Sequence, residues 1–157
     1  MFFKKLSIIL SITLLVFSSS AISASALYNS NPDSYLTIEV IIKDLENIDN
    51  KMLLLLKSIP RQNLDKNDLK NSISHIYTLI DDLNMKTSYL PKENKHVGMA
   101  VNSIISIYQL SLVSAEKYLN NSQPEDLLDS SSYFSTAYYS LSNIRNVIYQ
   151  AAKQVAS

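Results

Sequence analysis

The sequence contains no cysteine, and this absence limits what the protein can be. Without cysteine there is no disulfide, so a hydrophobic core has to hold the fold together. A lipid attached after export also needs a cysteine at the new N-terminus, so we expect no lipid anchor. Nor can a haem be attached covalently, because that attachment uses a Cys-x-x-Cys-His motif.

Glycine is almost as rare, since Gly98 is the only one in 157 residues. A chain with one glycine can hardly make the tight turns of a β-protein, and it cannot form a glycine-rich phosphate loop. The 14 basic residues are balanced by 14 acidic residues, so the chain has no electrostatic basis for binding nucleic acid. These features favour a helical protein whose partner is not a nucleic acid.

The N-terminus has the pattern of a secretory signal peptide. Lysines precede an apolar run over residues 6–17, and the small residues 24–26 fit the cleavage site of signal peptidase. The apolar run is shorter than the roughly 20 residues that cross a bilayer, which argues against an uncleaved membrane anchor. We therefore expect residues 1–26 to be removed and residues 27–157 to form one exported domain.

Four segments of the remaining chain repeat apolar residues at the spacing that places them on one side of a helix. These segments span about 33–58, 67–89, 93–120 and 123–155. The predicted core residues are Ile38, Ile41, Leu45, Ile48, Met52, Leu55, Ile59, Leu69, Ile73, Ile76, Ile80, Leu83, Leu90, Val97, Val101, Ile104, Tyr108, Leu112, Ala115, Leu119, Phe134, Ala137, Leu141, Ile144, Ile148, Ala151 and Val155. Four such helices with short loops predict an all-α fold, namely an antiparallel up-down-up-down four-helix bundle.

Polar residues predict how the helices begin and which sides face water. Asn67 is a plausible N-cap of the second helix. Ser122 and Glu125 have the spacing of a capping box at the start of the fourth helix. In the first helix Asp49 falls between core positions, so we expect it to face water.

Residues 97–115 of the third helix carry no charged side chain. A membrane span would explain this, but Asn102, Gln109 and several serines favour a helix that is buried on more than one side. Away from the main apolar stripe lie Met99, Ile107, Leu110 and Val113. We expect a partner to cover this second side.

The fourth helix is rich in serine and tyrosine, which has two interpretations. Its tyrosines can flank the core with their hydroxyl groups in water, or they can form a contact surface, because tyrosine offers stiff amphipathic area. The predicted partner-binding residues are Met99, Leu110, Val113, Tyr138, Tyr139, Lys92 and Lys95.

The sequence contains no recognisable catalytic motif, so we expect neither enzymatic activity nor a bound cofactor. Its two histidines, His75 and His96, are expected to face solvent or the rim of the fold. A metal site would need a third ligand close by, and the Glu-x-x-His motif of di-iron bundles is absent. A periplasmic metal- or haem-carrying bundle is therefore kept only as an alternative.

Several short segments, taken in order, resemble a known family. Asn67 to Lys70 opens one helix, and Leu90 to Lys95 leads from its end into the next. That helix ends in Ala115 to Lys117, and Asn121 to Glu125 leads into a last helix that bears tyrosines. The order and spacing are similar to the PsbQ family, extrinsic lumenal subunits of photosystem II, over residues 35–149.

The resemblance implies a structural role without a cofactor. The protein would lie in the thylakoid lumen, peripheral to the membrane, and dock on photosystem II core proteins and other extrinsic subunits. There it would stabilise the oxygen-evolving complex, including its retention of calcium and chloride. The alternative is an exported binding or immunity-type bundle, periplasmic or secreted, that sequesters a secreted partner.

Overall fold

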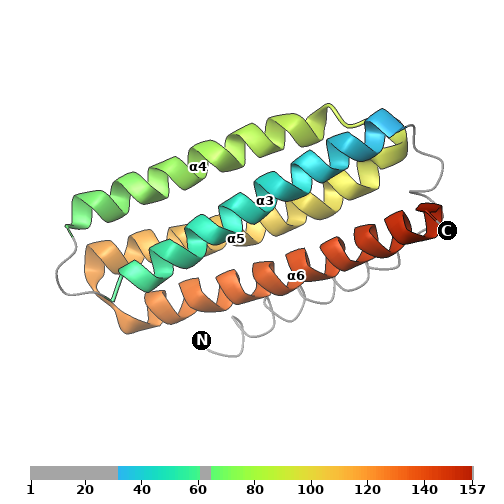
Figure 1. Ribbon diagram of the computed structural model, residues 1–157. Coiled ribbons are helices and arrows are strands. Elements are labelled where there is room, and N and C mark those ends of the chain that lie inside the picture. Colours follow the sequence, from blue (N-terminus) through green and yellow to red (C-terminus); the bar gives the residue numbers. More distant parts are fainter. Residues whose placement is uncertain (1–31, 61–64, 157) are drawn as a thin grey trace.

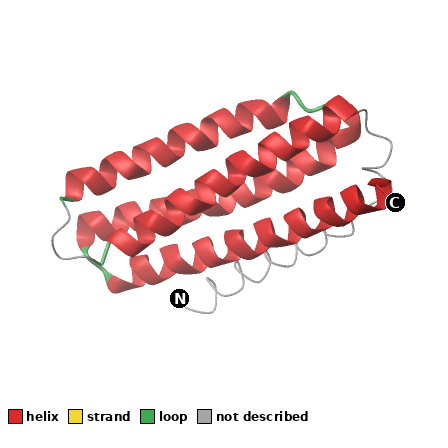
Figure 2. Ribbon diagram, in the orientation of Figure 1, coloured by secondary structure: helices red, strands yellow, loops and turns green. Residues whose placement is uncertain are grey.

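The computed structural model describes residues 32–60 and 65–156, and its side chains are described over 37–60 and 65–148. This part of the chain is all-α, as the sequence predicts, and contains no strand (Figure 2). Its helices are α3 (Pro32–Ser58), α4 (Lys66–Ser88), the short 3-10 helix η2 (Lys92–Asn94), α5 (Lys95–Asn121) and α6 (Pro124–Ala156). The predicted signal peptide, residues 1–26, lies outside the described residues.

The four long helices lie side by side along one direction (Figure 1). Each helix packs on its neighbour in sequence, and α3 also packs on α6. The contact between α5 and α6 is the most extensive, and only Ser122 and Gln123 separate these two helices in the chain. This arrangement encloses a single hydrophobic core between the helices.

The predicted core positions are confirmed wherever their side chains are described. All of them are buried except Phe134, which is partly buried and packs against the core. Ala151 and Val155 lie outside the described side chains. Full burial of one large aliphatic side chain contributes about 1.5–3 kcal/mol, so the isoleucines and leucines that all four helices bury are the main source of stability.

Two of the predicted caps are wrong. Asp65, rather than Asn67, caps α4, because the Asp65 carboxylate accepts from the backbone N–H of Asn67 at 2.9 Å. Ser122 closes α5 instead of opening α6 in a capping box. It takes the left-handed conformation, with φ 58°, and its N–H donates to the carbonyl of Tyr118. Pro124 then begins α6, at a position where its missing N–H costs nothing.

Asp49 was expected to face water, but only 7% of it is exposed. The reason is Tyr108, which is fully buried on α5 and whose hydroxyl donates to Asp49 on α3 at 2.5 Å. Burial raises the pKa of Asp49, and the hydrogen bond from Tyr108 opposes that rise. Burial and the neighbouring carboxylate also raise the pKa of Tyr108 far above its usual range. The pair thus links α3 to α5 through the core.

Small side chains allow α5 and α6 to approach closely. Ser111 donates to the carbonyl of Ser130 at 2.7 Å, and Ser130 donates to the carbonyl of Ser111 at 2.8 Å. Both serines are fully buried. Gly98 plays a similar role between α4 and α5, because a Cβ there would lie only 3.2 Å from Leu90 Cδ1.

We predict that Tyr108→Phe lowers the free energy of unfolding by about 1–3 kcal/mol, because it leaves the buried carboxylate of Asp49 without its donor. The loss should be smaller in an Asp49→Asn background, where no buried charge remains. A double-mutant cycle from urea denaturation measures this coupling. Tyr118→Phe on the same helix is the control and should have little effect. Equal losses in both backgrounds would contradict the proposed coupling.

The raised pKa of Asp49 also predicts a pH dependence. Between its ordinary value of 3.8 and its higher folded value, the folded state holds a proton that the unfolded state does not. The contribution of Asp49 to stability therefore rises as pH falls through this window. We therefore compare the free energy of unfolding of the wild type with that of the Asp49→Asn variant. The wild-type value minus the variant value should increase as pH is lowered from neutrality towards 3.8. A difference that stays constant or decreases would contradict the assignment.

We expect Ser130→Val to lower the free energy of unfolding by about 2–4 kcal/mol. The larger side chain pushes α6 away from α5, and the Ser111 hydroxyl loses a buried hydrogen bond. Thermal unfolding followed by circular dichroism measures the loss. Ser132→Val, at an exposed position of α6, is the matched control, and an equal change in both variants would refute the explanation.

Candidate functional site

The outer sides of α5 and α6 form a surface without charge. Residues 97–115 of α5 and residues 130–144 of α6 contain no acidic or basic side chain. The bonds between Ser111 and Ser130 bring these two stretches to the same level. We call their exposed side chains the uncharged surface. They are Met99, Asn102, Ser103, Ser106, Leu110, Val113, Ser131, Ser132, Ser135, Tyr138 and Tyr139.

Four serine hydroxyl groups of the uncharged surface are bonded within their own helices. Ser103 and Ser106 donate to the carbonyls four residues earlier, at 2.9 Å in both cases. Ser131 and Ser135 do the same on α6, at 3.0 and 2.9 Å. Because these donors already have acceptors, covering them with a partner leaves no hydroxyl proton unbonded. These four serines can therefore lose water at low cost.

Three of the predicted partner-binding residues share the solvent side of α5. The exposed fractions are 71% for Met99, 39% for Leu110 and 40% for Val113. Ile107, which was also expected to need an outside partner, is only 2% exposed. Ile107 belongs to the hydrophobic core, so the expectation that an outside partner covers it is wrong. Met99, Leu110 and Val113 remain available for a partner.

Tyr138 and Tyr139 lie exposed on α6 and connect to the core through a series of ring contacts. The centroids of Tyr108 and Phe134 are 6.3 Å apart, and those of Phe134 and Tyr138 are also 6.3 Å apart. Tyr138 meets Tyr139 edge-on at 5.8 Å. These contacts hold the exposed rings in place, so a partner that packs on them would immobilise fewer free side chains.

The predicted lysines lie apart from the apolar anchors. Lys92 is in η2 and Lys95 begins α5, and both are exposed. They therefore mark one end of the uncharged surface instead of forming its middle. The structure thus places the predicted residues on two neighbouring helices and on the turn before α5.

The outer sides of α3 and α4 differ sharply from the uncharged surface. On α3, Lys43 and Glu39 are paired at 3.1 Å. Lys86 of α4 meets Asp44 of α3 at 2.6 Å, and this hydrogen bond raises the pKa of Lys86. Exposed ion pairs of this kind stabilise a fold only weakly. Their main effect is to keep this half of the molecule hydrated.

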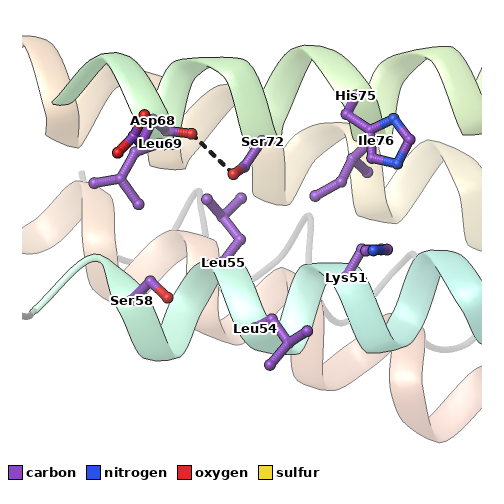
Figure 3. Close-up of a pocket in the computed structure, with 9 residues that line it drawn as sticks. All are labelled: Lys51, Leu54, Leu55, Ser58, Asp68, Leu69, Ser72, His75 and Ile76. Carbon is purple, nitrogen blue, oxygen red and sulfur yellow. Dashed lines mark hydrogen bonds between the residues drawn. The ribbon is translucent and has the colours of Figure 1, made fainter. Parts of the chain in front are cut away.

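An open groove of about 220 Å³ runs between α3 and α4 (Figure 3). Its lining consists of Lys51, Leu54, Leu55, Ser58, Asp68, Leu69, Ser72, His75 and Ile76. The Ser72 hydroxyl donates to the backbone carbonyl of Asp68 at 2.9 Å, so its proton is held inside α4. This leaves an apolar floor with a polar rim, and the Ser72 hydroxyl proton is directed to Asp68 and not to His75.

Neither histidine belongs to a group of three potential metal ligands among the described residues. His75 is exposed on α4, whereas His96 is half-buried near the start of α5, with its Nε2 atom buried and without a hydrogen-bond partner. Within the part of the chain that the structure describes, no three His, Cys, Asp or Glu side chains are grouped to hold a metal ion. The described geometry therefore gives the metal-site alternative no third ligand.

By length and composition, the segment Lys92–Asn121 could cross a membrane. However, 56% of its most apolar window is buried against the rest of the chain. A core helix of a soluble protein has this same property. The burial of α5 thus agrees with the interpretation that this helix is covered on more than one side.

Comparisons of this chain with protein-family models, with curated proteins and with solved structures find no match. The resemblance to the PsbQ family therefore rests on the sequence segments quoted above. The feature that the structure adds is the uncharged surface.

Proposed function

We propose that this protein is a non-enzymatic extrinsic subunit that docks on the lumenal side of photosystem II and stabilises the oxygen-evolving complex. The observation that supports docking is the uncharged surface of α5 and α6. The choice of photosystem II as the receptor rests on the resemblance of the quoted segments to the PsbQ family. The first support concerns a surface that two helices form together, and the second concerns short segments of the sequence.

The proposed docking uses the apolar side chains of the uncharged surface as anchors. Met99, Leu110 and Val113 would lose their remaining contact with water on binding. Tyr138 and Tyr139 add area that is already held in place by ring contacts. Because charges at a rim mainly set orientation and association rate, Lys92 and Lys95 would align this end with carboxylates on the receptor.

We also propose that the fold is an antiparallel up-down-up-down four-helix bundle. Support comes from the colours of Figure 1, which run in alternating directions along α3, α4, α5 and α6. Short connections between consecutive helices favour the same arrangement. Residues 1–26 act as the cleaved signal peptide in this proposal, so the exported domain would be peripheral to the membrane without a lipid anchor.

The same surface supports a second candidate, an exported binding or immunity-type bundle. Nothing on the uncharged surface is specific to a photosystem, so it would also suit a secreted partner. Genomic neighbourhood separates the two candidates, because a toxin gene beside this one favours the second. The third alternative, a metal- or haem-carrying bundle, would need ligands in the core, and among the described residues neither histidine is fully buried.

We predict that tagged protein co-purifies with photosystem II from detergent-solubilised thylakoids of its source organism. Val113→Lys should reduce the recovered photosystem at least about tenfold, because it buries an unpaired charge in the contact. The variant should unfold within about 0.5 kcal/mol of the wild type, since residue 113 is exposed.

Leu54→Lys is the matched control, because Leu54 is an exposed apolar residue on α3, outside the uncharged surface. It should leave the recovery unchanged. Finding the wild type only in the free soluble fraction would reject photosystem II as the receptor. An equal loss in both variants would reject the uncharged surface as the docking site.

A further inference from the structure

We propose that the uncharged surface also binds a second copy of this chain, so that the free protein forms a two-fold symmetric dimer. In this dimer α5 of one copy packs on α6 of the other, and the two-fold axis runs parallel to the helices. The inference does not depend on photosystem II as the receptor. It rests on the charge, the hydrogen bonding and the size of the surface.

The first argument is the absence of repulsion. In a two-fold dimer the same surface meets itself, so any charge on it is brought towards its own copy. Residues 97–115 and 130–144 have no charges that could repel one another. The outer sides of α3 and α4 would instead bring Lys43, Asp44 and Lys86 into a contact. Self-association is therefore least costly through α5 and α6.

The second argument is the low cost of removing water. The hydroxyl groups of Ser103, Ser106, Ser131 and Ser135 donate to carbonyls of their own helices. A second copy would not have to supply acceptors for them. Met99, Leu110 and Val113 add exposed apolar area to the same surface. Both features favour contact with another uncharged surface, and a second copy provides one.

The third argument is size. At about 1.5 Å per residue, the uncharged stretch of α5 is about 27 Å long, and two adjacent helices are roughly 20 Å wide. Two copies would then bury roughly 1,100 Å² in total, close to the lower limit for specific interfaces. The surface is large enough for a dimer, and we expect that dimer to be weak, with a micromolar Kd.

Charges at the ends select the orientation of the two copies. The bond between Ser111 and Ser130 places these two residues at the same level of α5 and α6. The chain turns back between the two helices (Figure 1), so Lys117, which follows Ser111, lies level with Glu125, which precedes Ser130. With the axis parallel to the helices, Lys117 of one copy faces Glu125 of the other, and the pair occurs twice. With the axis perpendicular to them, Lys95 would face Lys117 of the other copy. Opposite charges therefore favour the parallel axis.

Sedimentation equilibrium of the purified protein over micromolar concentrations tests the dimer. We expect the wild type to change from monomer to dimer as its concentration rises. Ser106→Lys, in the middle of the uncharged surface, should weaken dimerisation about 100-fold or more, since its charge has no partner there. Ser74→Lys, at an exposed position on α4, is the matched control and should leave the Kd unchanged.

A charge exchange tests the orientation. Glu125→Lys should weaken the dimer about tenfold, because it sets two lysines against each other at both symmetric positions. The double variant Lys117→Glu with Glu125→Lys should restore the wild-type Kd. With the perpendicular axis, by contrast, Lys117→Glu alone would strengthen the dimer.

The outcomes are distinct. A protein that stays monomeric throughout the concentration range, or a dimer that is insensitive to Ser106→Lys, would overturn the proposed interface. A dimer that Lys117→Glu alone strengthens would overturn its orientation. Neither result affects the co-purification experiment with photosystem II, so the two proposals can fail separately. If both hold, dimerisation and docking compete for one surface.

Discussion

The hydrogen bonds between Ser111 and Ser130 set the distance between α5 and α6, and several other features depend on that distance. Small side chains are required at this crossing, because each hydroxyl reaches the backbone carbonyl of the facing helix. The same bonds bring two uncharged stretches of sequence to one level. A wider spacing would separate the surface into two narrow stripes.

A second polar contact, between Asp49 and Tyr108, acts across the core. A buried carboxylate is costly unless it is hydrogen bonded, and the Tyr108 hydroxyl supplies that bond. Most of the core consists of aliphatic side chains, which pack with little directional preference. A buried polar pair is satisfied in only one register of α3 against α5. We infer that it helps to specify the packing of the helices more than it adds to their stability.

The sequence predicted the helices and the core well, for a physical reason. Uninterrupted spacing such as that of Ile38, Ile41, Leu45 and Ile48 leaves a single way to bury the apolar side of a helix. The failures have a different cause. Asp49 occupies a position that is polar by pattern, and only the three-dimensional structure shows that Tyr108 reaches it. The expectation that an outside partner covers Ile107 was wrong for a similar reason. Helical periodicity does not show how much of a helix the neighbouring helices cover.

The candidate site was predicted only in part. The uncharged stretch of α5 and the exposed tyrosines were visible in the sequence, since both are local features. The uncharged stretch on α6, residues 130–144, is equally visible in the sequence. That it forms one surface with α5 could be recognised only from the structure, where Ser130 lies beside Ser111. The internal bonding of the serine hydroxyls could not be predicted, because a serine on a helix can also donate to water. A recognition surface formed by two helices depends on which helices lie side by side, and a single sequence does not show this directly.

The serine bonds on the outer sides of α5 and α6 also affect how stiff these helices are. Each carbonyl that accepts a serine hydroxyl is shared with the helical N–H, and such sharing tends to bend a helix and to weaken its ladder. The inner sides, in contrast, are fixed by the core and by Ser111 and Ser130. The outer sides of α5 and α6 therefore carry bonds that favour bending, whereas their inner sides carry bonds that fix the two helices to each other. The curvature of the uncharged surface is thus set in part by its own serines, and replacing them with alanine would change its shape as well as its polarity.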